Sequence, residues 1–183
     1  MERYDAILAG GGAAGLSLAY RMMHGGLSDK RILIIDLATK NANDRTWCFW
    51  SQEPELFDPI VRHRWSHIWF HGPHRSHRWA MNPYDYRMIR GIDFYTYTLE
   101  DLRGRENVEF YTGRVNDIRD GDLETGEPAV VTVEDGECFA ADWVFDSLFI
   151  PREFSVDTRR YHFLKPHIVR RAVRTAQPVS DPD

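Results

Sequence analysis

The sequence has little cysteine and no long hydrophobic run, and each shortage excludes a class of protein. Cys48 and Cys138 are the only cysteines, too few for a disulfide framework, so we expect free thiols. No stretch approaches the roughly 18 apolar residues that a membrane-spanning helix needs. Residues 1–5 carry charges of both signs, and the apolar run after them breaks into glycines, unlike a signal peptide. The expected compartment is therefore the cytoplasm.

Positive charge is also in short supply. A formal net charge of −5 argues against a broad nucleic-acid-binding surface, so no nucleic-acid partner is expected. Aromatic residues are plentiful instead, at 13% of the chain with six tryptophans among them. The hydrophobic share of 43% and the charged share of 28% are those of a soluble globular domain.

The beginning of the chain has the pattern of a strand, a helix and a second strand. Residues 4–9 are a short apolar run that ends in glycines, which is typical of a buried parallel strand. Residues 12–23 have helical content, and Gly25-Gly26 ends that helix. Residues 31–36 are a second buried strand that closes on an acid. The pattern predicts a βαβ unit, which takes about 30 residues.

The rest of the chain predicts further strands, some of them antiparallel. The expected pieces are a loop at 36–64, a strand at 65–70 paired with 78–81, a helix at 92–102, a strand at 107–118, a hairpin of 129–133 with 138–140, and a strand at 142–149. The predicted fold class is α/β: a Rossmann-like FAD/NAD(P)-binding βαβ domain with an antiparallel β insertion. We expect this domain to span 1–150, with inserted strands at about 65–81. A substrate-binding region is expected to start at 151–183 and to be cut short.

A glycine fingerprint lies between the first strand and the helix. It is the run Gly10-Gly11-Gly12-Ala13-Ala14-Gly15, which has the pattern G-x-G-x-x-G. The pattern alone is weak, but a strand, a helix and a second strand ending in Asp36 supply its context. Gly10 would permit the tight turn, and Gly15 would let the helix pack close to the strand. Gly12 would let a pyrophosphate approach the helix N-terminus at Ala13 and Ala14.

Asp36 would accept hydrogen bonds from the ribose hydroxyls of an adenosine and would repel a 2′-phosphate, which disfavours NADP. The fingerprint itself does not separate FAD from NAD, and a glycine-rich turn without a ligand is the other interpretation. Three later features favour FAD: a long loop after the second strand, a three-stranded antiparallel piece near 129–140, and the late return of an apolar strand at 142–149. This order is typical of flavoproteins with two dinucleotide folds.

Four later segments resemble the bacterial-type lycopene β-cyclases. They are Asn43-Asp44-Arg45-Thr46-Trp47-Cys48-Phe49-Trp50, then Tyr86-Arg87-Met88-Ile89-Arg90-Gly91-Ile92-Asp93-Phe94-Tyr95, then residues 142–149, and then residues 159–164. The D-R-T-W and R-G-I-D-F-Y segments are much narrower signals than the glycine fingerprint. Because these matches are spread along the chain, the resemblance covers nearly all of it.

This resemblance implies an FAD-binding domain related to the aromatic-hydroxylase-like flavoproteins. It implies cyclisation of the linear ends of lycopene into β-ionone rings by way of γ-carotene. That reaction is an isomerisation without net redox change, although it requires flavin reduced from NAD(P)H. The flavin is thought to assist acid–base chemistry or to stabilise a carbocation.

The resemblance also places a cofactor site on named residues. Gly10, Gly12, Gly15 and Asp36 carry over as the FAD site. Arg45 is expected near the pyrophosphate, because a guanidinium matches phosphate geometry, and Arg90 is expected to contact the cofactor too. Val115 stands where related flavoproteins meet the adenine with backbone groups, and Asp146 is expected near the middle of the cofactor.

Members of the family run well beyond 183 residues, so the sequence is interpreted as an N-terminal fragment. The family's acidic motif and second flavin motif are expected beyond Asp183, and no catalytic residue can be assigned to this chain. Such a fragment would bind FAD weakly or not at all. The expected partners are a carotenoid substrate, lycopene, and a membrane surface that gives access to it, on the inner face of the membrane. The basic run at 159–174 is either a contact with anionic lipid or a solvated tail.

Two other groups of side chains have competing interpretations. Five of the eight histidines fall within residues 63–77, but the stretch 65–71 is strand-like and brings no cysteine or carboxylate, so no metal site is expected. The aromatic side chains between 47 and 79 are either core or the lining of an apolar tunnel for a polyene. The alternatives to a cyclase are an FAD-dependent monooxygenase of the hydroxylase type and a non-catalytic nucleotide-binding domain.

Overall fold

The computed structural model describes residues 1–122, 124–148, 157 and 160. The first compact unit of the chain is Met1–Leu148. The second region expected at 151–183 lies outside the described residues, apart from Asp157 and Arg160. Asp183, beyond which the acidic motif and the catalytic residue of the family are expected, lies outside them too, so that expectation stays a prediction. The strand expected at 142–149 is described only as far as residue 148.

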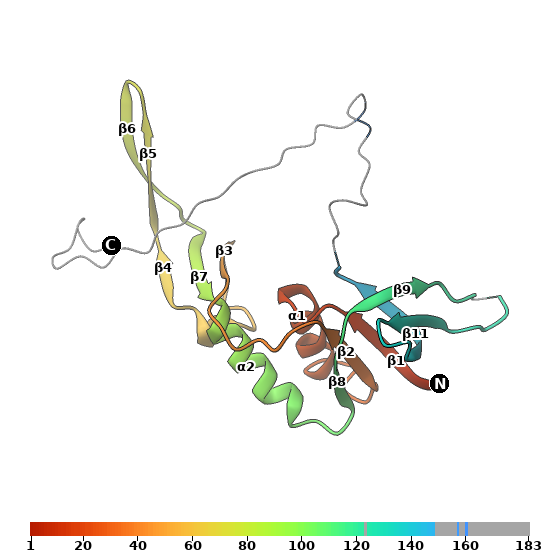
Figure 1. Ribbon diagram of the computed structural model, residues 1–183. Coiled ribbons are helices and arrows are strands. Elements are labelled where there is room, and N and C mark those ends of the chain that lie inside the picture. The colour runs from red at the N-terminus through yellow and green to blue at the C-terminus, as the bar shows by residue number, and fades with distance from the viewer. Residues whose placement is uncertain (123, 149–156, 158–159, 161–183) are drawn as a thin grey trace. The chain divides into compact units, whose positions relative to one another are not determined.

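Six strands form the main sheet, in the order β8-β2-β1-β11-β10-β9 (Figure 1). Their bounds are β1 Glu2–Ala9, β2 Ile32–Asp36, β8 Val108–Thr112, β9 Val115–Arg119, β10 Ala129–Val133 and β11 Cys138–Asp146. The first four strands of that order run parallel, and β10 and β9 run antiparallel. The sheet confirms the predicted fold class, because a parallel βαβ core is extended by antiparallel strands.

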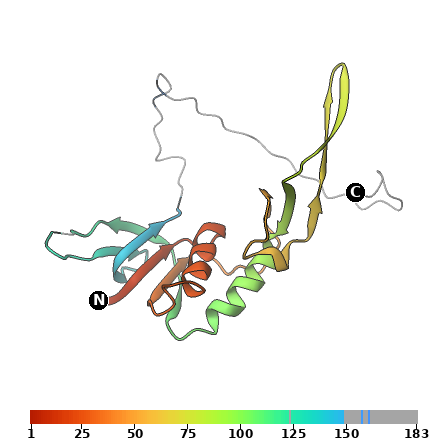
Figure 2. The ribbon, with the colours of Figure 1, turned by 180° about the vertical axis from the view of Figure 1, so that it is seen from behind.

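Two helices cover one face of this sheet. They are α1 (Ala13–Met23) and α2 (Gly91–Arg103), which lie side by side in both views (Figures 1 and 2). Leu16 and Ala19 of α1 and Leu102 of α2 are buried against strand residues such as Leu8 and Ile34. The apolar stripe predicted for the second helix therefore faces the core, and the helix begins one residue earlier than expected.

The other face of the parallel strands is covered by the antiparallel strands. Ile7 and Leu33 share a buried cluster with Val131, Val133 and Phe139, which belong to β10 and β11. The three-stranded piece predicted from the sequence thus supplies the second half of the core. Both faces of the βαβ unit are closed by apolar packing, as a parallel sheet requires.

A second, three-stranded sheet and a hairpin lie between β2 and α2 in the chain. The sheet has the order β3-β7-β4, with β3 Thr46–Ser51, β4 His63–Trp65 and β7 Asp85–Arg90. The hairpin pairs β5 (His67–Gly72) with β6 (Arg75–Ala80), and a short 3₁₀ helix spans Asp58–Ile60. The pairing expected between 65–70 and 78–81 is confirmed, with the strands shifted toward the turn.

Three expectations about strands were wrong. The stretch 36–64 is not all loop, because it contains β3, β4 and the 3₁₀ helix. The single strand expected at 107–118 is two strands, β8 and β9, which lie at opposite edges of the main sheet. Conversely, the pieces expected at 138–140 and 142–149 are one strand, β11, which pairs with β10 at one end and with β1 along its length. Among the described residues, no helix is long and apolar enough to cross a membrane.

Candidate functional site

The glycine run makes the turn from β1 into α1. Gly10 adopts a φ of 111°, a backbone conformation that side-chain-bearing residues rarely adopt. Its N–H donates to the carbonyl oxygen of Ile35 at 2.8 Å, which holds the turn against the end of β2. Gly12 is the N-cap residue of α1, and its carbonyl oxygen accepts the first helical hydrogen bond, from Leu16.

The three fingerprint glycines differ in what a side chain would meet. A Cβ at Gly10 would collide with the hydroxyl of Ser147, and a Cβ at Gly15 would collide with the carbonyl oxygen of Gly10. A Cβ at Gly12 would meet no atom within 4 Å. The fold therefore needs Gly10 and Gly15, whereas the open space at Gly12 is what a group docked on the turn would need.

The N-terminus of α1 is suited to bind an anion. No side chain among the described residues caps it with a hydrogen bond, and its first turn contains no acidic residue. The first N–H groups of a helix lack intrahelical partners and carry the positive end of the helix dipole. Ala13 and Ala14, the first two helical residues, place only methyl groups beside these donors. A phosphate at this point would be bound by backbone groups.

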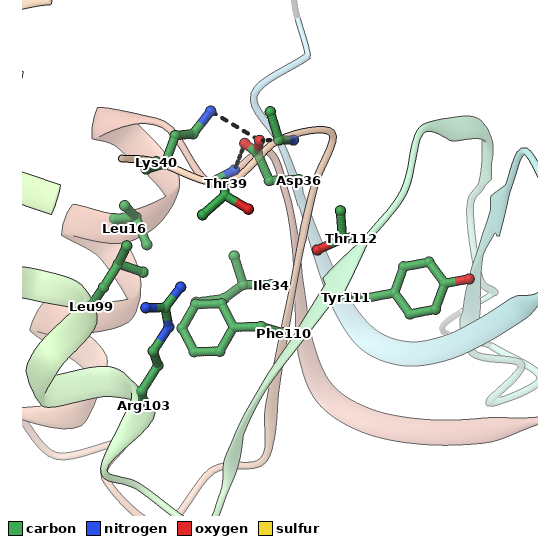
Figure 3. A pocket seen from close by; sticks show the side chains of 12 residues that line it. Leu16, Ile34, Asp36, Thr39, Lys40, Leu99, Arg103, Phe110, Tyr111 and Thr112 are labelled. Atoms are coloured by element: carbon green, nitrogen blue, oxygen red, sulfur yellow. Dashed lines mark hydrogen bonds and ion pairs between the residues drawn. The ribbon is translucent and has the colours of Figure 1, made fainter. Parts of the chain in front are cut away.

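Asp36 ends β2 beside the glycine turn, and its carboxylate already has three partners. One oxygen accepts from the N–H of Gly11 at 2.7 Å. The other accepts from the N–H of Ala38 at 2.9 Å and lies 2.9 Å from the ammonium of Lys40 (Figure 3). The sequence interpretation missed Lys40, because a lysine in a loop carries no signal of its partner. Because Lys40 offsets the charge of Asp36, the repulsion of a 2′-phosphate is weaker than the sequence alone implied.

A small cavity of about 60 Å³ opens beside Asp36, at the carboxyl ends of β2 and β8 (Figure 3). Its lining comprises Gly11, Leu16, Ile34, Asp36, Ala38, Thr39, Lys40, Leu99, Arg103, Phe110, Tyr111 and Thr112. Complete ligand pockets are roughly 300–1,000 Å³. The cavity is therefore one corner of a site, placed where ligands bind in open α/β sheets.

Arg45 lies directly before β3, and Arg90 ends β7, the strand that pairs with β3. The carbonyl oxygen of Arg45 accepts from the N–H of Gly91 at 2.8 Å, and Thr46 pairs with Arg90 across β3 and β7. Burial raises the pKa of Tyr95, the charge and the hydrogen bond of Asp44 add to that rise, and the charge of Arg45 opposes it. The backbone of Arg45 therefore lies at the start of α2, and a contact of its guanidinium with a pyrophosphate stays a prediction.

Arg90 is engaged elsewhere. Its guanidinium donates to both carboxylate oxygens of Asp93 at 2.6 Å, and the pair lines a separate hollow with Arg62. The hydrogen bonds from Arg90 lower the pKa of Asp93. The structure therefore does not bring Arg90 into the lining of the cavity beside Asp36, and its contact with a cofactor stays a prediction.

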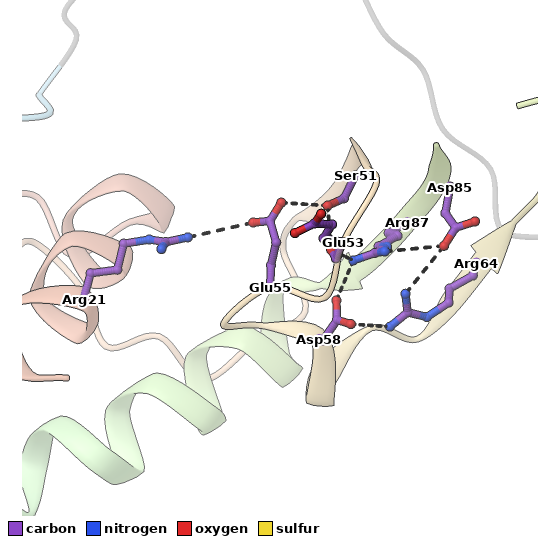
Figure 4. A network of polar contacts seen from close by, with 8 residues as sticks. All are labelled: Arg21, Ser51, Glu53, Glu55, Asp58, Arg64, Asp85 and Arg87. Carbon is purple, nitrogen blue, oxygen red and sulfur yellow. Dashed lines mark hydrogen bonds and ion pairs between the residues drawn. The ribbon is translucent and has the colours of Figure 1, made fainter. Parts of the chain in front are cut away.

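An ionic cluster holds β7, the strand that Arg90 ends. The side chain of Arg87 on β7 is 3% exposed and donates to Asp58 at 2.7 Å and to the carbonyl oxygen of Glu53 at 2.9 Å (Figure 4). Asp58 also pairs with Arg64 at 2.9 Å, and Asp85 lies 3.4 Å from Arg87. The Nε of Arg87 is buried without a hydrogen-bond partner among the described residues. The cluster ties β4 and β7 to the 3₁₀ helix.

Asp146 lies at the carboxyl end of β11, whereas Val115 is the first residue of β9. The N–H of Gly113 donates to the carbonyl oxygen of Asp36 at 3.0 Å, so the backbone just before Val115 borders the Asp36 corner. The side chain of Val115 packs into the second core cluster instead. Asp146 stands opposite Ala9 in the parallel register and accepts from the N–H of Leu148 at 2.7 Å.

Ser147 is a residue that sequence reasoning missed. Its N–H and its hydroxyl both donate to the carbonyl oxygen of Ala9 at 2.9 Å, directly before the glycine turn. Ser147 therefore fastens the end of β11 to the turn. Its place after an apolar strand gave no signal in the sequence that could have distinguished it.

The five clustered histidines do not converge. Among the described residues, no group of three histidine, cysteine, aspartate or glutamate side chains is arranged to hold a metal ion. His67 and His71 instead contact the hydroxyls of Ser66 and Ser76 at 2.9 Å.

Comparisons with known proteins bear on this site. A family model described as lycopene cyclase protein matches residues 5–183. No curated protein matches the chain. The chain is similar to the solved structure of PqsL from Pseudomonas aeruginosa, described as a probable FAD-dependent monooxygenase, with a TM-score of 0.61 and 14% identity, covering 78% of this chain and 42% of that one.

A second solved structure, p-nitrophenol 4-monooxygenase PnpA from Pseudomonas putida, gives a TM-score of 0.57 and 18% identity, covering 79% of this chain and 40% of that one. At these identities the likeness shows the fold alone. The chain spans about two-fifths of the length of both structures.

Proposed function

The chain belongs to the lycopene cyclase family, and from this premise we propose that the complete protein is an FAD-dependent lycopene β-cyclase. The reaction would close the linear ends of lycopene into β-ionone rings, an isomerisation without net redox change. The observation that carries the cofactor assignment is the open space at Gly12, in front of a helix N-terminus that no side chain among the described residues caps.

The residues of the glycine turn and the Asp36 corner fit FAD. The backbone N–H groups at Ala13 and Ala14 would bind the pyrophosphate, and Gly12 leaves room for it. Asp36 would accept hydrogen bonds from the ribose hydroxyls. The hydrogen bonds that its carboxylate accepts from the N–H groups of Gly11 and Ala38 already hold it in place. Arg45 would add positive charge near the phosphates. The flavin, when bound and reduced by NAD(P)H, would supply an electron-rich ring that stabilises positive charge on the substrate.

The test of the reaction is turnover of lycopene by the complete protein with FAD and NAD(P)H. We expect β-ionone rings to form without consumption of oxygen and without NAD(P)H oxidation in proportion to the rings formed, because the product is an isomer of the substrate. Ring formation that required one oxygen molecule per turnover would contradict the proposal, as would the absence of any ring product.

The second candidate function is an FAD-dependent monooxygenase, which the fold shared with PqsL and PnpA favours. In that case each turnover would consume oxygen and NAD(P)H together and would add an oxygen atom to the substrate. Mass analysis of the product separates the two functions, because cyclisation leaves the mass of lycopene unchanged. A non-catalytic nucleotide-binding domain would bind FAD but would neither cyclise nor oxygenate lycopene.

We also propose that the protein works in the cytoplasm at the inner face of the membrane, because lycopene is dissolved in lipid. The basic run at 159–174, which the sequence offered for this contact, lies outside the described residues apart from Arg160. Fractionation of cells into membrane and supernatant in low and high salt would test this location. Salt-releasable protein in the membrane fraction is the expected result, and protein found only in the supernatant would contradict it.

A further inference from the structure

One segment of the chain is free of carboxylates. Residues 59–84 contain no aspartate or glutamate, although the whole chain has 28. The same segment holds four arginines and no lysine, so its formal charge is +4 while that of the whole chain is −5. It corresponds to β4, β5 and β6 with their connections. Positive charge is therefore concentrated on an otherwise acidic protein.

The hairpin β5–β6 within this segment exposes large aromatic side chains. Trp69 is 59% exposed, Phe70 57% and Trp79 48%. Phe70 and Trp79 stack on one face of the ribbon with ring centroids 5.8 Å apart. On the opposite face Trp69 stacks on His71 at 5.7 Å. All six residues of β6 are exposed, and so are Trp69, Phe70 and His71 of β5.

Figure 1 shows the hairpin extending beyond the ends of β4 and β7. Its tip, with the turn from Gly72 to Arg75, borders a hollow of about 510 Å³ that Phe70 and Trp79 also line. A ribbon of two strands is only marginally stable in water when it stands alone. Exposed aromatics grouped in this way mark a surface that binds something.

We propose that the β5–β6 hairpin docks on an anionic lipid surface. Tryptophan favours the membrane–water interface, where its ring lies among the headgroups and its N–H stays hydrated. Arginine beside it is attracted to anionic headgroups. Phe70, Trp79 and Arg75 offer both interactions at one end of a ribbon. An acidic protein partner would be attracted to the arginines as well, but the exposed rings on both faces suit immersion in an interface better than docking on a protein surface.

The inference deepens the proposed function, since a cyclase must reach a substrate that is dissolved in lipid. It rests on the proposed function only for the reason why the protein would bind lipid. Lipid binding itself requires neither flavin nor carotenoid. A protein that binds vesicles through the hairpin but forms no rings would overturn the proposed reaction alone. A protein that forms rings but binds vesicles independently of the hairpin would overturn this inference alone.

The test is sedimentation of the complete protein with vesicles of phosphatidylcholine, with and without phosphatidylglycerol. We expect binding to the anionic vesicles that Arg75→Gln weakens about fivefold, because each basic side chain near an anionic surface contributes a factor of about five. The variant Trp69→Ser/Phe70→Ser should bind at least about tenfold more weakly. The matched controls are Arg119→Gln and Trp143→Ser, whose parent residues are exposed on the main sheet, and these should bind as the parent does.

Three results would overturn the docking proposal: equal binding to neutral and anionic vesicles, hairpin variants that bind like the controls, and hairpin tryptophans that soluble quenchers cannot reach in the lipid-free protein. The last result would mean that protein covers the ribbon, whether from the same chain or from a second copy. Circular dichroism of each variant separates lost docking from lost folding. The arginine variant keeps the test valid if the aromatic variant does not fold.

Discussion

A Cβ added at Gly15 would overlap the carbonyl oxygen of Gly10, which is backbone and cannot rotate away. We therefore expect Gly15→Ala to lower the free energy of unfolding by about 1–3 kcal/mol, the usual cost of overpacking a closed site. Urea unfolding followed by circular dichroism measures this. Gly26→Ala is the control, because a Cβ there meets no atom within 4 Å. A Gly15→Ala protein as stable as the parent would show that the turn is looser than described.

Asp58 and Arg87 give a second prediction at the scale of residues. Burial by itself raises the pKa of Asp58, but the hydrogen bond and the charge of Arg64, a backbone hydrogen bond at Glu55 and the charge of Arg87 outweigh it, so the pKa lies below its ordinary value. A carboxylate with a depressed folded-state pKa stabilises the fold fully above its unfolded pKa of about 3.9. That stabilisation is lost as the pH falls through the folded-state pKa.

Asp58→Asn should therefore destabilise the protein at pH 7 and flatten the acid side of its stability profile. We expect the free energy of unfolding to fall by about 3 kcal/mol, because the variant breaks the buried ion pair between Asp58 and Arg87. Asp85 stays near Arg87 and keeps the loss at the lower end of the usual range. Arg64→Gln, which breaks an exposed pair, should cost less than about 1 kcal/mol. Chemical denaturation from pH 3 to pH 7 tests both variants. Equal losses in the two would contradict the assignment of Arg87 as the buried centre of the cluster.

Some site residues were predictable one by one and others were not. The fingerprint glycines and Asp36 follow from spacing, because the turn geometry dictates which positions tolerate no side chain and which strand end faces the turn. Lys40 and Ser147 were missed, since a lysine in a loop and a serine after a strand are ordinary in sequence. Arg90 shows the opposite failure: a guanidinium suits a phosphate, but an aspartate three residues away already occupies it.

At the scale of elements, the sequence predicted those whose pattern is local. The βαβ unit, α2 and the β5–β6 pairing have apolar periodicity or turn residues within a short window. The strands β3 and β7 were missed because their residues are mostly half-buried and no clean alternation of polar and apolar residues marks them. The split between β8 and β9 at Gly113 was missed because alternation continues through it, and only pairing decides that they lie at opposite edges.

The exposure of the β5–β6 hairpin predicts fast amide exchange in that element. Its hydrogen bonds are confined to two strands with both faces in water, so local opening costs little free energy. In lipid-free protein we expect the amides of β6 to exchange orders of magnitude faster than those of β1, which lies between two strands. Hydrogen–deuterium exchange read by mass spectrometry measures this. Comparable protection in the two strands would mean that the ribbon is packed against protein.

At the scale of the whole molecule, the described residues supply one part of the proposed cofactor site. The cavity beside Asp36 is much smaller than a dinucleotide needs, and the chain spans about two-fifths of the solved structures that share its fold. Ring closure, the source of the catalytic proton and the acceptance of lycopene are therefore properties to be measured on the complete protein. The proposed cofactor site is different, because the residues proposed for its phosphate-binding end all lie within β1, the glycine turn, α1 and β2.

The most direct measurement is a titration of the complete protein with FAD, followed by flavin fluorescence, for the parent, Gly12→Val and Gly26→Val. A Cβ at either glycine meets no atom within 4 Å, and we expect all three proteins to unfold at similar temperatures. We predict saturable binding by the parent and by Gly26→Val, and none by Gly12→Val, whose side chain would fill the space for the pyrophosphate. A complete protein that binds no FAD, or a Gly12→Val variant that binds as tightly as the parent, would contradict the account.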